Sequence, residues 1–267
     1  MTKTAIISGG AGGLGKAFGA KLRDHGWFVV ALDLPGPELH QLRDLPRTCA
    51  IGCDITDGVQ LAETAVSLRE ARPSIDMVVY NAGITHIGPF AEQLTEDHRR
   101  VFEVNYFAAV AMAGLFGPDI RRSRGTHLAI SSVAGFSPLA YRTAYAASKH
   151  ALEGFFSSLR SEERPHGVSC LIAAPSFIAT NPGTPSSGLA RPGAAKDAID
   201  SVTPGQAAEE LYRGLAAKRD FIPIGRVARA SNLLNRLSPA LFQRLMERRI
   251  LKTSAIRSEP LQDPNPH

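Results

Sequence analysis

The chain has 267 residues, of which 44% are hydrophobic and 21% are charged, so one large or two small domains can bury a sizeable core. The sequence lacks the pattern of a signal peptide and any apolar run long enough to cross a bilayer, and we therefore expect a cytoplasmic protein. Cys49, Cys53 and Cys170 lie in apolar runs and are odd in number, which favours buried free thiols in a reducing compartment.

The net charge of +5 is unevenly distributed along the chain. Residues 213–257 carry eleven Lys and Arg against Asp220 and Glu247, a local net charge of +9, and the remainder of the chain has a net charge of −4. The basic excess is therefore a property of the C-terminal segment. No nucleic-acid-reading motif accompanies these basic residues, so we expect no nucleic-acid partner.

Short apolar runs alternate along the chain with segments of helical periodicity. The predicted strands are 4–8, 27–33, 49–54, 76–83, 126–132, 168–175 and 221–225. The predicted helices are 13–25, 59–71, 96–122, 143–164 and 204–218. Nearly continuous apolar strands separated by helices indicate a parallel sheet covered on both faces. We predict a single doubly wound α/β Rossmann domain with a seven-stranded, mostly parallel sheet.

Two segments fall outside this alternation. Residues 181–203 are rich in Gly, Pro and Ser, and we interpret them as a mobile flap within a domain spanning 1–225. Residues 226–267 form a basic extension, in which Ser238 and Pro239 predict the start of an amphipathic helix over 238–250. We expect this helix to dock on the same domain with its basic face solvated, which we favour over contact with a membrane.

A glycine cluster, SGGAGGLG at 8–15, follows the first predicted strand and precedes a helix. Glycines at 9, 13 and 15 let the backbone approach a pyrophosphate, and the helix N-terminus offers it unpaired N–H groups. The second predicted strand ends at Asp33, whose carboxylate can accept both adenosine ribose hydroxyls and would repel a 2′-phosphate. We therefore favour NAD over NADP, although Asp33 and Asp54 could each simply cap a turn or helix.

Tyr145 and Lys149 lie four residues apart, and so on one face of a predicted helix. A nearby ammonium favours the phenolate and moves a tyrosine towards the pKa range of a general acid/base. The alternative is a core tyrosine beside a lysine that extends to solvent.

These motifs together resemble the short-chain dehydrogenase/reductase superfamily, in its classical branch. The resemblance is carried by Gly9, Gly13 and Gly15, by the Asn-Ala-Gly at 81–83, and by ISSVAG and YAASK at 130–135 and 145–149. Asn105 and the PSFIAT at 175–180 also match, whereas Ser176 stands where the family has glycine. The resemblance covers residues 4 to about 225.

The resemblance implies an oxidoreductase with a set of catalytic and cofactor-binding residues and no metal site. The catalytic residues implied are Asn105, Ser132, Tyr145 and Lys149. The cofactor contacts implied are Gly9, Gly13, Leu14, Gly15, Asp33, Asp54, Ile55, Asn81, Ala82, Gly83, Tyr145, Lys149, Ile178 and Thr180. Ser131 and Tyr141 are the competitors of Ser132 and Tyr145, and Asn105 could be a purely structural polar group.

We expect a small-molecule substrate, an apolar secondary alcohol or ketone, and the sequence does not choose among steroid, fatty, terpenoid, aromatic and sugar-like alcohols. The predicted pocket wall, 84–90, 133–143 and 177–203, contains Phe90, Phe136, Leu139 and Phe177, although these side chains could equally be ordinary core. The alternatives are a dinucleotide sensor without turnover and an epimerase or dehydratase of the extended relatives. Family members are commonly oligomers, so a homodimer or homotetramer is expected.

Overall fold

The computed structural model describes residues 2–72, 74–180, 188–190 and 201–257, with side chains to Arg248. Its main sheet has the strand order β11-β7-β6-β4-β1-β2-β3, and every strand pair in it is parallel. The strands are β1 (Thr4–Ser8), β2 (Phe28–Asp33), β3 (Thr48–Gly52), β4 (Met77–Tyr80), β6 (Thr126–Ile130), β7 (Ser169–Pro175) and β11 (Phe221–Ile224). Strand order reverses direction between β1 and β4, and ligands of such sheets bind outside the strand ends at this switch point.

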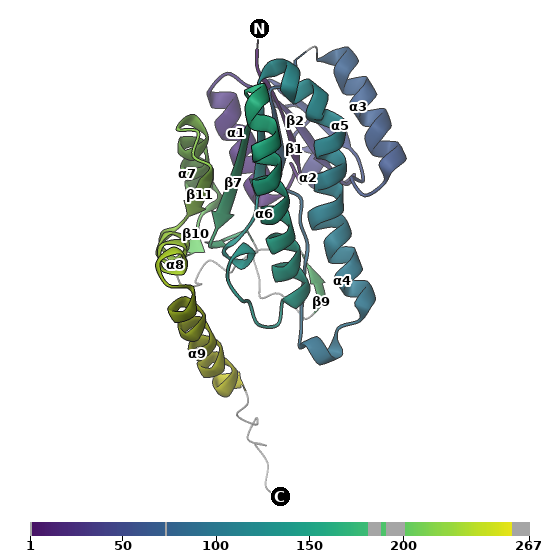
Figure 1. Ribbon diagram of the computed structural model, residues 1–267. Coiled ribbons are helices and arrows are strands. Elements are labelled where there is room, and N and C mark those ends of the chain that lie inside the picture. Colours follow the sequence, from purple (N-terminus) through teal and green to yellow (C-terminus); the bar gives the residue numbers. More distant parts are fainter. Residues whose placement is uncertain (1, 73, 181–187, 191–200, 258–267) are drawn as a thin grey trace, which may run out of the picture.

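Helices cover both faces of this sheet, as predicted (Figure 1). One face carries α1 (Gly13–Asp24) and α7 (Pro204–Ala216). The other carries α3 (Gly58–Ala71), α4 (Thr95–Phe102), α5 (Ala108–Ser123) and α6 (Thr143–Glu163), and the short α2 (Pro37–His40) follows β2. Consecutive strand residues alternate between the two cores: Ile7 packs with Phe18 of α1, and Ile6 belongs to the core that contains Phe116 and Phe156.

Several predicted strands end earlier in the structure than in the sequence interpretation. The segment 76–83 is a strand only to Tyr80, and 126–132 only to Ile130. The Asn-Ala-Gly at 81–83 and Ser132 therefore lie in the loops just beyond the strand ends. Ser132 caps a short 3-10 turn, η3 (Val133–Gly135), by accepting a hydrogen bond from Ala134 N at 3.1 Å.

The predicted helix 96–122 is interrupted by a π-helical turn, η2 (Glu103–Phe107), between α4 and α5. Helical periodicity continues across it, so the pattern of apolar residues does not reveal it. The whole run Thr95–Ser123 is long and apolar enough, by length and composition, to span a membrane. The core helix of a soluble protein passes the same test, and Met112, Phe116 and Ile120 of α5 are fully buried against the sheet.

The predicted flap, 181–203, falls largely outside the described residues. Its described parts are β9 (Gly188–Ala190), antiparallel to β5 (Thr85–Ile87), and β10 (Ser201–Val202), parallel to β8 (Phe177–Ile178). Two further 3-10 turns are η1 (Phe90–Glu92) and η4 (Arg164–His166).

The basic extension begins with two helices, α8 (Arg226–Leu237) and α9 (Pro239–Arg257). The second starts at Pro239, as predicted. The side chain that docks it is Phe242, which is 2% exposed and packs against Phe136 with ring centroids 6.3 Å apart. Leu237, Leu241 and Leu245, which recur at helical spacing along this extension, are exposed.

Candidate active site

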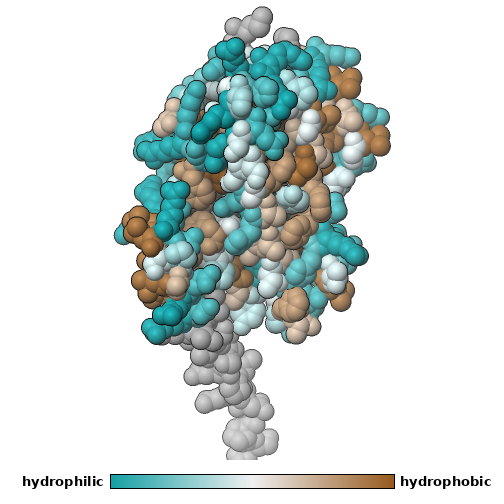
Figure 2. All heavy atoms as spheres, in the orientation of Figure 1, coloured by the Kyte–Doolittle hydropathy of each residue, from teal (hydrophilic) through white to brown (hydrophobic). Residues whose placement is uncertain are grey.

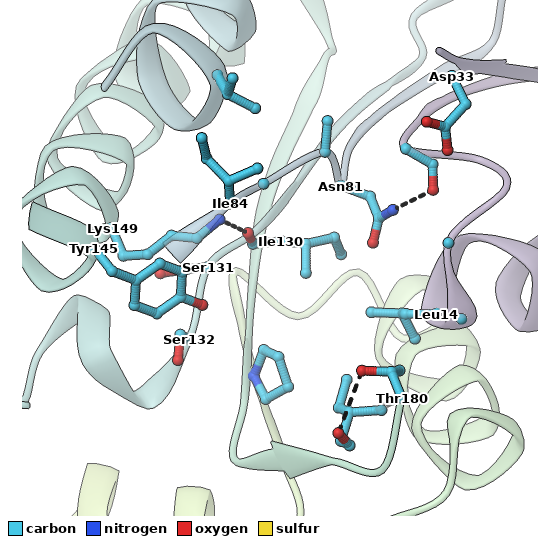
Figure 3. Close-up of a pocket in the computed structure, with 18 of the residues that line it drawn as sticks. Leu14, Asp33, Asn81, Ile84, Ile130, Ser131, Ser132, Tyr145, Lys149 and Thr180 are labelled. Atoms are coloured by element: carbon cyan, nitrogen blue, oxygen red, sulfur yellow. Dashed lines mark hydrogen bonds between the residues drawn. The ribbon is translucent and has the colours of Figure 1, made fainter. Parts of the chain in front are cut away.

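A cavity of about 490 Å³ opens at the carboxyl ends of the central strands and gathers most of the predicted site residues. The predicted residues that line it are Gly9, Gly13, Leu14, Asp33, Asp54, Ile55, Asn81, Ala82, Gly83, Ser132, Tyr145, Lys149, Ile178 and Thr180. Figure 3 shows Asp33 and Asn81 on one side of this space and Ser132, Tyr145 and Lys149 on the other. Gly15 and Asn105 are not among the lining residues and act from behind it.

The glycine loop is shaped by two close approaches. Gly9 has a φ of +64°, and a Cβ there would lie 2.9 Å from the Cα of Ala82. A Cβ at Gly15 would lie 2.3 Å from the carbonyl oxygen of Gly9. The loop therefore requires glycine at both positions, and Gly15 serves the turn rather than the cavity wall.

The N-terminus of α1 faces the cavity without a side-chain cap. Its N-cap, Gly12, makes no side-chain hydrogen bond, and its first turn contains no acidic residue. Gly13 and Leu14 of this turn line the cavity. Free N–H groups and a positive helix end suit a phosphate, so this part of the cavity fits the pyrophosphate of a dinucleotide.

Asp33 lines the cavity, where its carboxylate could accept the hydroxyls of an adenosine ribose, and it also bonds to the backbone. Its Oδ2 accepts a hydrogen bond from Ala11 N at 3.0 Å and its Oδ1 from Leu34 N at 2.9 Å. The carboxylate thus holds the glycine loop while lining the cavity. Asp54 accepts hydrogen bonds from the backbone and hydroxyl of Thr56, and the helix cap that follows is Asp57 rather than Asp54.

Asn81 fixes the glycine loop through its side chain. Its Nδ2 donates to the carbonyl oxygens of Ser8 at 3.0 Å and Gly9 at 2.9 Å. The Ser8 hydroxyl in turn accepts from the backbone N–H groups of Asn81 and Ala82. The Asn-Ala-Gly segment is therefore a brace between the ends of β1 and β4.

Tyr145, on α6, lies in the cavity beside Ser132 (Figure 3). Burial raises the pKa of Tyr145, whereas the neighbouring Ser132 hydroxyl and the charge of Arg142 lower it. Arg142 is thus a second cation near Tyr145, besides Lys149, which the sequence analysis named. Arg142 lines the same cavity, and its place three residues before Tyr145 is the signal that sequence reasoning missed.

Lys149 is 2% exposed, and burial lowers its pKa to about 8. Its Nζ donates to the carbonyl oxygen of Ile130 at 2.8 Å and lies 5.8 Å from the centroid of the Tyr145 ring. The alternative interpretation, in which the lysine extends past the tyrosine to solvent, is therefore wrong. The ammonium is held inside the cavity wall, next to the end of β6.

Glu153 is a second residue that the sequence analysis missed, and it contacts Ser131, the competitor of Ser132, which also lines the cavity. The Ser131 hydroxyl donates to Glu153 Oε1 at 2.6 Å. Ser131 therefore points away from Ser132, as strand alternation predicts. Glu153 lies one helical turn beyond Lys149, and its charge raises the pKa of Lys149 against the larger effect of burial.

Asn105 occupies the π-helical turn and has a structural role. It is 1% exposed, accepts from Ile84 N at 2.8 Å, and donates to Ile84 O and to Ser148 Oγ, each at 2.9 Å. π-helical turns often occur at functional sites because they redirect a side chain. Here the turn aims Asn105 at the loop carrying Gly83, where a Cβ would meet both Asn105 Oδ1 and Lys149 Nζ within 4 Å.

Only some of the residues predicted for the pocket wall line the cavity. Of the predicted wall residues, Leu139 and Phe177 line it, whereas Phe136 packs against Phe221 and Phe242, and Phe90 is 68% exposed. Ser176, which replaces the family glycine, also lines the cavity, and its backbone N–H donates to Ile224 O at 3.0 Å. Ile178 and Thr180 still reach the cavity despite this replacement.

Comparison with known proteins identifies the family. A family model described as short chain dehydrogenase matches residues 3–188. The Dehydrogenase/reductase SDR family member 7B of Bos taurus is 31% identical over 265 residues, which cover 92% of this chain and 81% of that protein.

Solved structures share the fold at lower identity. A short chain dehydrogenase from Burkholderia cenocepacia in complex with NADP matches with a TM-score of 0.78 at 24% identity, covering 92% of this chain and 98% of that one. A short chain dehydrogenase/reductase from Burkholderia phymatum in complex with NAD matches with a TM-score of 0.78 at 22% identity, covering 90% and 95%. The match to the family model and the bovine relative confirm the resemblance read from the motifs: this chain belongs to the short-chain dehydrogenase family of oxidoreductases.

Proposed function

We propose that the protein is a nicotinamide-dinucleotide-dependent oxidoreductase that interconverts a secondary alcohol and a ketone, with Tyr145 as the general acid/base. The observation that carries this proposal is that Ser132, Tyr145 and Lys149 meet in the same cavity as an uncapped, glycine-rich helix N-terminus. The Burkholderia structures in complex with NADP and NAD support the same class of cofactor. When bound, the cofactor supplies the acceptor or donor of the hydride.

The residues of this chain would bind the substrate oxygen and transfer the proton. Ser132 donates a hydrogen bond to the substrate oxygen and holds it beside the Tyr145 hydroxyl. Tyr145 removes the alcohol proton in the oxidative direction and returns it to the carbonyl oxygen in the reductive direction. Lys149 and Arg142 stabilise the phenolate form, and Asn105 supports a water that carries protons from Lys149 outward.

We propose NAD as the preferred cofactor because Asp33 lines the cavity at the end of β2, and a carboxylate there would repel the 2′-phosphate of NADP. Asp33→Ser should weaken NAD binding and narrow the difference between the NAD and NADP dissociation constants. The reverse order of affinities in the unmodified protein would contradict this preference.

We propose an apolar, small-molecule alcohol or ketone as the substrate, because Leu139 and Phe177 line the cavity. We propose a cytoplasmic location, because the buried free thiols of Cys53 and Cys170 are compatible with a reducing compartment.

The deciding experiment follows NADH or NADPH fluorescence with a panel of secondary alcohols, for the unmodified protein and for Tyr145→Phe. Turnover that falls by roughly 10²–10⁴-fold in the variant, with cofactor binding retained, supports the proposal. Near-complete turnover in Tyr145→Phe would overturn the assigned general acid/base. Cofactor binding without turnover on any substrate would instead favour a dinucleotide-sensing protein.

We also propose a homodimer or homotetramer formed through the helices that carry Asn105 and Tyr145. Phe107, at the end of the π-helical turn, is 50% exposed and offers an apolar contact there. Light scattering during size-exclusion chromatography measures the mass directly, and a monomeric mass would contradict this assignment.

A further inference from the structure

The C-terminal helices expose a row of leucines that the fold leaves uncovered. Leu233 and Leu237 of α8 are 60% and 76% exposed, and Leu241 and Leu245 of α9 are 47% and 44% exposed. The four recur at every fourth position. Phe242 is the residue that anchors α9 to the domain, so these leucines face outward.

Arginines share the outward side of these helices. On α8, Arg226, Arg229 and Arg236 are exposed at helical spacing with Leu233 and Leu237. Arg229 also forms an ion pair with Glu210, with Nη2 and Oε1 2.8 Å apart. Figure 2 shows apolar surface among hydrophilic surface at the left of the molecule, over α8. Apolar and cationic side chains therefore occupy one surface rather than opposite sides of the helix.

The charge of this surface restricts what can cover it. Residues 226–248 contain five arginines and one glutamate, a net charge of +4. A second copy of the chain related by a two-fold axis would bring this basic surface against itself. Leucines that enter the boundary between headgroups and acyl chains, with guanidinium groups at the phosphates, satisfy both features at once.

We propose that residues 226–248 form a docking surface for an anionic phospholipid membrane, to which the protein binds peripherally. The assignment does not depend on the proposed reaction, because it rests only on α8 and α9. Each arginine near an anionic surface strengthens binding by roughly fivefold, and the attraction weakens as salt screens it.

The test is sedimentation of the full chain with vesicles of phosphatidylcholine alone and of phosphatidylcholine mixed with phosphatidylglycerol. Binding is expected to the anionic vesicles, to be much weaker with phosphatidylcholine alone, and to fall with added salt. Leu237→Ser combined with Leu241→Ser should weaken binding by roughly tenfold. Leu94→Ser is the matched control, since Leu94 is 69% exposed on α4's N-terminal side and should leave binding unchanged.

Charge variants test the same surface without altering its apolar residues. Arg236→Glu should weaken binding by at least fivefold, whereas Arg99→Glu, whose side chain is 71% exposed on α4, should not. If the double leucine variant does not fold, which circular dichroism and the Tm will show, the charge variants alone test whether residues 226–248 bind the vesicles.

Three outcomes would overturn the proposal. The first is a full chain that stays in the supernatant with anionic vesicles at low salt. The second is equal weakening by the control variants at Leu94 and Arg99. The third is a leucine variant that lowers the molecular mass in solution while the unmodified protein does not bind vesicles, which would assign the surface to a second copy of the chain.

Discussion

Two tyrosines of this protein are buried almost equally, but their surroundings differ. Tyr80, on β4, is 2% exposed and Tyr145, on α6, is 6% exposed. Burial raises the pKa of both phenols. Tyr80 lies 2.6 Å from His127 Nδ1 within the hydrophobic core, against Phe156. Tyr145 instead opens into the cavity beside Ser132.

This contrast separates burial from reactivity. A buried phenol becomes a poorer acid wherever it lies, because the charged form loses its hydration. Around Tyr80, the charge of Glu163 adds to that effect. Around Tyr145, the neighbouring Ser132 hydroxyl and the Arg142 cation act against it, and the side chain lines a cavity. The region around Tyr80 is therefore structural, and the region around Tyr145 carries the proposed chemistry.

After Tyr145→Phe, the largest loss of turnover is expected from Lys149→Met. The substitution removes the ammonium near Tyr145 and the donor to Ile130 O, so turnover should fall by roughly 10²-fold or more. Steady-state kinetics at saturating cofactor will measure this loss. Because the two residues act as a unit, adding Tyr145→Phe to Lys149→Met should cost much less than the two losses multiplied. Turnover within threefold of the unmodified protein would show that Lys149 supports the fold only.

The His127 region should instead control the pH dependence of stability. Burial lowers the pKa of His127 to about 4, below the value of about 6.5 that the unfolded chain has. As the pH falls, the unfolded chain therefore binds the proton before the folded protein does. The contribution of neutral His127 to the free energy of unfolding is complete above pH 6.5 and is lost as the pH falls towards 4. The expected loss of unfolding free energy is about 3 kcal/mol.

Urea unfolding at a series of pH values will measure how the free energy of unfolding changes with pH. His127→Asn is the matched variant, because its amide oxygen can still accept a hydrogen bond from the Tyr80 hydroxyl but does not titrate. Its unfolding free energy should fall less steeply below pH 6.5. Equal slopes for both proteins would assign the pH dependence to other groups.

Tyr80→Phe and Tyr145→Phe form the direct comparison of the two regions. Tyr80→Phe leaves His127 Nδ1 buried without its partner, which should cost about 1–3 kcal/mol of unfolding free energy. Turnover should change by less than twofold. Tyr145→Phe should do the opposite and leave the unfolding free energy nearly unchanged, because its hydroxyl lies at the cavity. Denaturant unfolding and kinetics on both variants will show whether the regions separate in this way.

Much of this architecture follows from patterns that the sequence displays directly. Apolar runs of strand length depend on local chemistry, so they predicted the sheet. The grouping of Ser132 with Tyr145 and Lys149 was implied by the resemblance to the family, and the three residues line one cavity in the structure. The early end of β4 depends on Asn81 bonding to Gly9 O, a contact between distant segments. Such contacts have no local signature.

The same reason explains the remaining differences. The π-helical turn at 103–107 is set by Asn105 bonding to the Ile84 backbone, and helical periodicity does not record it. The outward leucines of α8 and α9 depend on which side of these helices docks on the domain, and helical periodicity does not record that. Arg142 is a different case, because it is the N-cap of α6, three residues before Tyr145, and its approach could have been predicted from the sequence.

The smallest expected effect is a shift in the pH profile from Glu153→Gln. Its carboxylate raises the pKa of Lys149, and glutamine can accept the same Ser131 hydrogen bond without the charge. The Lys149 ammonium should then lose its proton at lower pH, so kcat/KM should decline earlier on the alkaline side, by roughly threefold near the Lys149 pKa. Ser131→Ala keeps the charge and removes the hydrogen bond, so its alkaline limb should not move to lower pH. If both variants moved the limb equally, the geometry of the loop after β6, rather than the charge of Glu153, would control Lys149.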